Sequence, residues 1–203
     1  MENLLKNLMK PLVFFILLMA PLAALAQQHH LGIRAGEPFA ITYKTFLDEQ
    51  FSAEAMVGRG GPNSTQYYRR AFENSRPVSS AIYTGQSTSD ALSLHARLAY
   101  NEDISSEFNI TEGQLFGYAG VGAMLRSVRV NYVYHTPSPT TEGQFRNDHR
   151  TNIDFGPEAF IGSEYYFEDF PISVFAEVGM FLEVVDRPGH IKLLGGIGAR
   201  YLF

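Results

Sequence analysis

Acidic residues in the last third of the chain recur at even spacing, and the chemistry open to them is charge pairing. Asp154, Glu158 and Glu164 occupy positions of one parity, and the positions between them are mainly apolar. Glu177 and Glu183 also share a parity, opposite an unbroken apolar face. Successive side chains of a strand point to opposite faces of a sheet. The pattern therefore predicts strands with one charged face and one apolar face.

Charged faces of this kind must point inward if the strands cross a membrane. A basic side chain that faces lipid near the midplane costs about 2–4 kcal/mol. Applied strand by strand, this rule predicts an interior ionic network of Arg34, Lys44, Glu54, Arg97, Arg126, Asp154, Glu158, Glu164, Glu177, Glu183, Lys192 and Arg200. The two signs balance, and eight strands enclose a space that side chains can fill. We therefore expect a neutral, plugged interior and no open pore.

The sequence offers no catalytic, cofactor or metal site of recognisable spacing. A hydrolase needs a nucleophile, a base and an orienting acid within reach, and the six histidines match no such arrangement. The adjacent His29 and His30 have no third ligand, which favours a flexible N-terminus over a metal site. Glycine clusters such as 195–198 fall inside expected strands rather than before a helix, so they are not nucleotide-binding loops. We expect no enzyme activity and no cofactor.

The first 26 residues have the organisation of an export signal. Lys6 and Lys10 precede an apolar core, and the segment ends in Ala24-Leu-Ala26, an A-x-A cleavage site. We predict a signal peptide over residues 1–26, cleavage between Ala26 and Gln27, and one mature domain over 27–203. The chain contains no cysteine. A cysteine-linked lipid anchor and disulfides are therefore excluded.

The charge of the mature chain argues against nucleic-acid binding. The chain has 16 basic and 21 acidic residues, and the leader contains Lys6, Lys10 and Glu2, so 14 and 20 remain and the net charge is −6. That balance is opposite to the basic surface that binds nucleic acid. After the leader, no apolar run is long enough for a membrane helix. The apolar residues alternate instead, as in membrane barrels.

Alternation and turn residues predict eight strands. They span residues 31–36, 39–47, 51–58, 91–101, 114–127, 152–167, 172–185 and 192–203. An even number of strands places both termini on one side of the membrane. If the first strand starts in the periplasm, the outer loops are 37–38, 59–90, 128–151 and 186–190. The inner turns are then 48–50, 102–113 and 168–171. Long outer loops and short inner turns are typical of outer-membrane barrels. The predicted fold is all-β: an eight-stranded antiparallel up-and-down transmembrane β-barrel with a plugged polar interior.

The last strand ends on Phe203, with Tyr201 two positions before it. With the segments 31–36, 41–44, 118–122, 161–165 and 196–203, this end resembles the small outer-membrane β-barrel domain family, of OmpA-like or OmpX-like type. The resemblance implies that Tyr201 and Phe203 are read by the barrel assembly machinery. It also implies a place in the bacterial outer membrane, among its lipid and lipopolysaccharide. Members of the family serve as structural proteins, adhesins, host-interaction factors and narrow channels.

The long loops hold the remaining candidates for binding. Tyr67, Tyr68, Arg69, Arg70 and Phe72 combine aromatic and guanidinium groups, which are enriched in binding hot spots. They are candidates for contact with a surface ligand or host protein. The alternating segment 126–134 predicts a protruding strand whose edge could recruit another chain. The alternative is that both loops are variable decoration, with arginines on lipopolysaccharide phosphates.

These observations lead to a structural or adhesin-like outer-membrane barrel as the expected function. A narrow channel for small solutes is the first alternative, and a lipid A- or phospholipid-modifying barrel enzyme is the second. A soluble, lipocalin-like barrel is an alternative fold. It would turn its apolar face toward a ligand and leave the twelve charges outside, and it would not need a terminal aromatic residue.

Overall fold

A computed structural model describes residues 28–137 and 143–203. In this part of the chain, eight strands form one closed antiparallel barrel in sequence order. The elements are β1 His29–Glu37, β2 Phe39–Phe46, β3 Phe51–Arg59, α2 Thr65–Asn74, β4 Ile82–Asp103, β5 Gln114–Thr136, β6 Gln144–Tyr166, β7 Ile172–Leu182 and β8 Ile191–Leu202. The predicted fold class is confirmed. The predicted signal peptide and its cleavage site between Ala26 and Gln27 lie outside the described residues.

The barrel wall has an apolar outer face and a polar inner face. On β7 the outward Ile172, Val174, Val178, Met180 and Leu182 are 39–63% exposed, whereas the inward acidic side chain between them is buried. Leaving apolar area in water costs roughly 25 cal/mol per Å². An outward apolar band is therefore suited to lipid, and the polar face is kept away from it. The neighbouring strands continue the band with Leu31, Ile33, Ile41, Leu98, Val121, Ile161 and Ile197.

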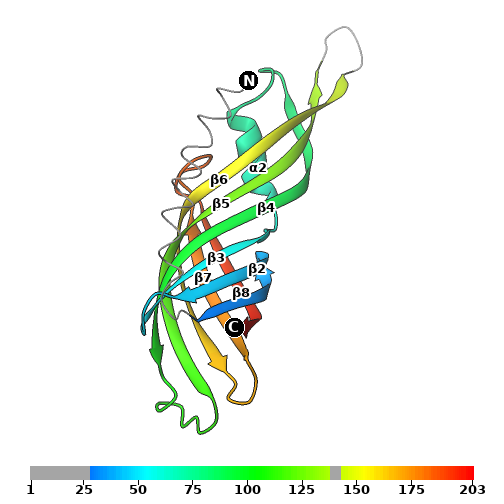
Figure 1. Ribbon diagram of the computed structural model, residues 1–203. Coiled ribbons are helices and arrows are strands. Elements are labelled where there is room, and N and C mark those ends of the chain that lie inside the picture. Colours follow the sequence, from blue (N-terminus) through cyan, green and yellow to red (C-terminus); the bar gives the residue numbers. More distant parts are fainter. Residues whose placement is uncertain (1–27, 138–142) are drawn as a thin grey trace, which may run out of the picture.

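Both described ends of the chain meet at one end of the barrel. β1 pairs with β8, and the backbone N–H groups of His29 and Phe203 donate to each other's carbonyls at 3.2 and 2.9 Å. The connections 47–50, 104–113 and 167–171 lie at this end. The opposite end carries α2 and the connections after β5 and β7 (Figure 1). We call it the helix-bearing end.

Three strands extend beyond the rest of the barrel. β4, β5 and β6 have 22, 23 and 23 residues, whereas the other five strands have 8 to 12. β3 pairs with β4 only as far as Leu92, and β7 pairs with β6 only from Glu158 onward. The remaining parts of β4, β5 and β6 form a three-stranded sheet that rises above the barrel, which we call the extension (Figure 1).

The prediction that residues 128–151 form an outer loop is wrong for most of this range, whereas the predicted continuation of the strand over 126–134 is confirmed. β5 continues to Thr136, and β6 begins at Gln144. The prediction of a free edge along 126–134 is wrong as well, because β5 pairs with β4 on one side and with β6 on the other. The alternating apolar residues of this segment therefore serve packing within the chain rather than strand addition.

The prediction that residues 59–90 form an irregular polar loop is also wrong. Residues 65–74 form the helix α2, and β4 begins at Ile82. The helix begins after Ser64, whose hydroxyl accepts the N–H of Tyr67 at 3.2 Å, a typical N-cap. One face of α2 is apolar and packs on the extension, where Val128 and Val130 are buried beneath it. No helix in the described residues is long and apolar enough to span a membrane.

Large side chains fill the lumen between the charged ones. Met56, Tyr118, Met124, Phe160 and Phe181 point inward and are at most 7% exposed. Eight strands enclose a space just wide enough for such side chains. The plugged polar interior is therefore confirmed as part of the fold.

Candidate functional site at the helix-bearing end

The predicted interior charges form three groups along the barrel, and the first lies near the chain termini. Lys44 Nζ and Arg200 Nη1 lie 2.9 and 2.8 Å from the same oxygen of Glu164. Arg200 also lies 2.5 Å from Glu54. The hydroxyl of Ser173 donates to the other oxygen of Glu164 at 2.6 Å. These groups come from β2, β3, β6, β7 and β8, so they connect opposite walls.

The second group crosses the middle of the lumen. Arg97 on β4 forms a two-pronged contact with Glu158 at 2.8 and 3.0 Å. Its Nη1 also lies 2.7 Å from Glu177 on β7, and the Nε of Arg34 on β1 lies 2.9 Å from the same oxygen. His95 contacts Glu158 at 3.0 Å. The carboxylates of Glu158 and Glu177 together thus neutralise the guanidinium groups of Arg34 and Arg97.

The third group ties residues 60–63 to the helix-bearing end of the barrel. Arg126 is paired with Asp154 and donates to the carbonyl of Gly61 and the side-chain oxygen of Asn63, both at 2.5 Å. The backbone N–H of Gly61 donates to Glu37 at 2.6 Å, and Lys192 reaches the other oxygen of Glu37 at 2.6 Å. The sequence predicted a turn at Glu37. Its place at the end of β1, beside β8, gives Lys192 its counter-charge.

Glu183 differs from the other predicted interior acids because its contacts are with neutral groups. Its Oε1 accepts the Tyr67 hydroxyl at 2.9 Å and the Arg187 backbone N–H at 2.7 Å. Its Oε2 is buried and has no hydrogen-bond partner among the described residues. Glu183 follows the last residue of β7, outside the membrane-crossing strand. Burial, with Asp154 nearby, raises the pKa of Glu183 to about 7.

Three carboxylates gather around this side chain. One oxygen from each of Asp154, Glu183 and Asp186 lies within 4.8 Å of the others. Asp154 and Glu183 are buried and Asp186 is exposed. Burial raises the pKa of Asp186 as well. The predicted pairing of strands 152–167 and 172–185 already brought Asp154 and Glu183 to one end. The acid cluster could not be recognised from the sequence because Asp186 falls in a predicted surface turn.

The predicted surface-binding residues divide into two sets, and for three of them the predicted exposure is wrong. Tyr67, Tyr68 and Phe72 are at most 1% exposed, because they form the apolar face of α2 against the extension. Arg69 and Arg70 are exposed on its outer face. Spacings of one, four and five residues bring aromatic side chains to one side of a helix. The aromatic groups therefore anchor the helix, and the arginines face outward.

A cavity of about 320 Å³ opens beside the acid cluster, between α2, β6 and the connection after β7. Tyr67, Tyr132, Arg150, Asp186 and Arg187 contribute to its lining. Arg150 is held by Asp148 at 2.7 Å, and the guanidinium of Arg187 lies 5.1 Å from the centre of the Tyr67 ring. Aromatic rings, guanidinium groups and a carboxylate at one opening can bind a polar ligand.

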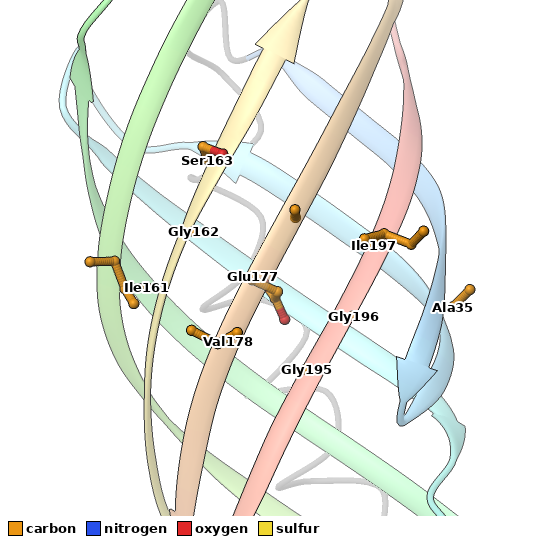
Figure 2. A pocket seen from close by; sticks show the side chains of 10 residues that line it. Ala35, Ile161, Gly162, Ser163, Glu177, Val178, Gly195, Gly196 and Ile197 are labelled. Atoms are coloured by element: carbon orange, nitrogen blue, oxygen red, sulfur yellow. The ribbon is translucent and has the colours of Figure 1, made fainter.

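A second, shallower hollow of about 620 Å³ lies on the outer wall of the barrel. Ile161, Val178 and Ile197, from β6, β7 and β8, surround it, and the small residues Gly195 and Gly196 form its floor (Figure 2). It belongs to the apolar outer face. The glycines leave space that longer side chains would fill, and Ser163 and Glu177 also contribute to the lining.

The terminal aromatic residues point outward from the barrel. Tyr201 and Phe203 are 55% and 65% exposed, and their rings stack at 6.4 Å. The ring of His29 lies 5.9 Å from both Phe203 and Tyr43. Aromatic residues collect at the interfaces of a membrane barrel. This position suits a membrane interface at the end that carries the chain termini.

Comparisons with known proteins were made at the level of sequence and of fold. The sequence matches no protein-family model, and no curated protein matches it significantly. The N-terminal β-barrel domain of Pseudomonas aeruginosa OprF matches with a TM-score of 0.47 and 9% identity, over 87% of this chain and 96% of the other. Ail, the attachment invasion locus protein of Yersinia pestis, matches with 0.44 and 10%, over 87% and 95%.

A major outer membrane protein from Thermus thermophilus also matches, with a TM-score of 0.47 and 11% identity over 88% of this chain and 100% of the other. The predicted architecture of eight antiparallel strands in one closed barrel is confirmed by the strand pairing itself. Likenesses this distant agree with the fold that the strand pairing establishes and indicate nothing about activity.

Proposed function

We propose that this chain is an integral outer-membrane β-barrel of structural or surface-interaction type, with a closed lumen and its helix-bearing end at the cell exterior. The observation that carries the proposal is the division of the molecule into two parts. The barrel is apolar outside and filled by paired charges inside. The extension and α2 rise beyond it and present exposed arginines and a cavity. The first part suits residence in a membrane, and the second suits contact with partners.

The orientation rests on the connections. In outer-membrane barrels the long connections face the exterior and the short turns face the periplasm. Here α2, the extension and the cavity share one end, and the chain termini and short connections share the other. In this arrangement Tyr201 and Phe203 lie at the periplasmic interface, where the assembly machinery would read them. Arg69 and Arg70 face outward, where lipopolysaccharide phosphates or a host protein would meet them.

Surface labelling tests the location and the orientation together. The chain contains no cysteine, so Ser79→Cys and Thr111→Cys each introduce a single thiol on an exposed residue, one at each end. We expect a membrane-impermeant maleimide to label Ser79→Cys on intact cells and Thr111→Cys only after lysis. Both variants should fractionate with the outer membrane and show heat-modifiable migration on gels. The opposite labelling pattern, or a soluble fraction, would contradict the proposal.

A closed lumen predicts the absence of conductance. Arg97, Glu158 and Glu177 bridge the lumen, and large side chains fill the space between these groups. Opening a path requires several buried ion pairs to break, at a cost of several kcal/mol. Purified protein in planar bilayers is therefore expected to show no ion currents above the background of the empty membrane. Stable, reproducible single-channel steps would favour the narrow-channel alternative instead.

The proposal gives the chain no catalytic role. Its partners would be outer-membrane lipid, lipopolysaccharide, the barrel assembly machinery and a surface ligand or host protein. An unchanged lipid A and phospholipid profile after deletion of the gene is the expected outcome. A specific change in either profile would favour the lipid-modifying alternative.

A further inference from the structure

We propose that Asp154, Glu183 and Asp186 bind a calcium ion beneath α2, and that the ion fastens the helix to the barrel. The three side chains come from β6, from the residue that follows β7, and from the connection before β8. Their nearest oxygens lie within 4.8 Å of one another. Ca²⁺ takes oxygen ligands at 2.3–2.6 Å, so oxygens at these separations can share one ion.

The partners of Glu183 and Asp154 leave oxygens available for an ion. Glu183 is fully buried, and its Oε2 has no hydrogen-bond partner among the described residues. A buried acceptor without a partner is costly, and a cation would satisfy it. Arg126 engages Oδ2 of Asp154, whereas the contact of Oδ1 is with the Tyr67 hydroxyl at 3.4 Å. One hydroxyl proton cannot serve both Asp154 and Glu183.

The local charge also favours a cation. Three carboxylates face two guanidinium groups, those of Arg126 and Arg187, since Lys192 is paired with Glu37. The His190 ring lies 4.9 Å from the Tyr67 ring. With all three carboxylates ionised, as metal binding requires, one negative charge is left over beside the buried side chains of Asp154 and Glu183. A divalent ion bound between the carboxylates compensates this negative charge more directly than a mobile counter-ion at the protein surface.

The ligand chemistry selects calcium. All three groups offer hard oxygen ligands, which suit Ca²⁺ and Mg²⁺ rather than softer metals. Mg²⁺ demands near-ideal octahedral geometry, whereas Ca²⁺ accepts six to eight oxygens in a flexible arrangement. Asp186 lies in an exposed connection that borders the cavity, so water can complete the coordination shell. Tyr67 joins the site to α2 through its bond to Glu183.

Calcium titration of the full chain in detergent free of lipopolysaccharide tests the site without depending on its orientation in the membrane. Terbium is a suitable probe, because the chain has no tryptophan and 11 tyrosines, and Tyr67 touches the site. We expect sensitised terbium emission that Ca²⁺ displaces, with a Kd on the order of 10⁻⁴ to 10⁻³ M. Mg²⁺ should compete more weakly.

Two variants and one control locate the ion. Because Asp186 is exposed, Asp186→Asn should fold normally and bind Ca²⁺ roughly tenfold more weakly, since affinity follows the number of charged ligands. Glu183→Gln should lose binding by at least as much. Asp169→Asn, on an exposed connection at the opposite end, should leave the Kd unchanged. Equal affinity in Asp186→Asn and wild type, or no Ca²⁺ binding up to about 10 mM, would overturn the proposal.

Protection of α2 provides a second readout. A bound ion stabilises the state that binds it in proportion to its occupancy. Ca²⁺ should therefore slow trypsin cleavage at Arg69 and Arg70 in the wild type but not in Asp186→Asn. An equal effect of Ca²⁺ on both proteins would show that the ion acts elsewhere.

Discussion

Replacing Glu177 with alanine is expected to destabilise the barrel by about 3–5 kcal/mol, because the change leaves buried cations without a partner. The oxygen Oε1 of Glu177 lies 2.9 Å from Arg34 and 2.7 Å from Arg97. Its Oε2 accepts the Tyr118 hydroxyl at 3.2 Å. Arg97 keeps Glu158, whereas Arg34 keeps, among the described residues, the carbonyl of Pro38 at 2.6 Å. The unpaired Arg34 accounts for most of the expected loss.

Urea unfolding in detergent micelles or lipid vesicles, followed by heat-modifiable migration, measures this effect. Val178→Ala is the matched control, because it removes side-chain atoms one position further along β7, on the outward face, where Val178 is 63% exposed. We expect it to cost less than about 1 kcal/mol, because an exposed site leaves no cavity. Glu177→Gln keeps the shape and removes the charge, so it should resemble Glu177→Ala more than wild type. Equal midpoints for Glu177→Ala and Val178→Ala would refute the role assigned to the interior charges.

The barrel could be predicted from the sequence because lipid imposes a strict rule on its strands. A charge on β6 or β7 cannot face lipid cheaply, so the parity of Asp154, Glu158 and Glu177 is enough to orient both strands. The structure buries these side chains. Their partners follow less directly, since Arg34 and Arg97 reach Glu177 from strands far apart in the sequence. Parity places a side chain inside the barrel but does not choose its partner.

The helix-bearing end could not be predicted in the same way, because lipid does not act on it. Between residues 59 and 90, glycine, proline and serine suggest a loop. The segment with helical periodicity, marked by Tyr67, Tyr68 and Phe72, is too short to give a clear helix signal. From the sequence these aromatic residues resemble a binding surface, but in the structure they pack against the extension. Likewise, Asp186 joins Asp154 and Glu183 only through the path of the connection after β7. Sites assembled from three separate elements need the tertiary structure.

Truncating Phe72 is expected to release α2 from the extension while the barrel stays folded. Phe72 is fully buried, and its ring lies 5.4–5.8 Å from those of Tyr83, Tyr132 and Tyr134. Phe→Ala in a core costs about 3–5 kcal/mol. The loss falls on the docking of the helix, because α2 contributes nothing to the pairing of the eight strands.

Trypsin measures the release, because Arg69 and Arg70 lie within the helix and cleavage there requires it to open. When opening is fast relative to cleavage, the rate follows the population of the open state. A loss of about 3 kcal/mol then corresponds to roughly 100-fold faster cleavage. Phe108→Ala is the matched control, because Phe108 is 63% exposed at the opposite end; it should leave the rate unchanged. If Phe72→Ala also lost heat-modifiable migration, α2 and the barrel would unfold as one cooperative unit. This result would contradict the prediction that the barrel stays folded when α2 is released.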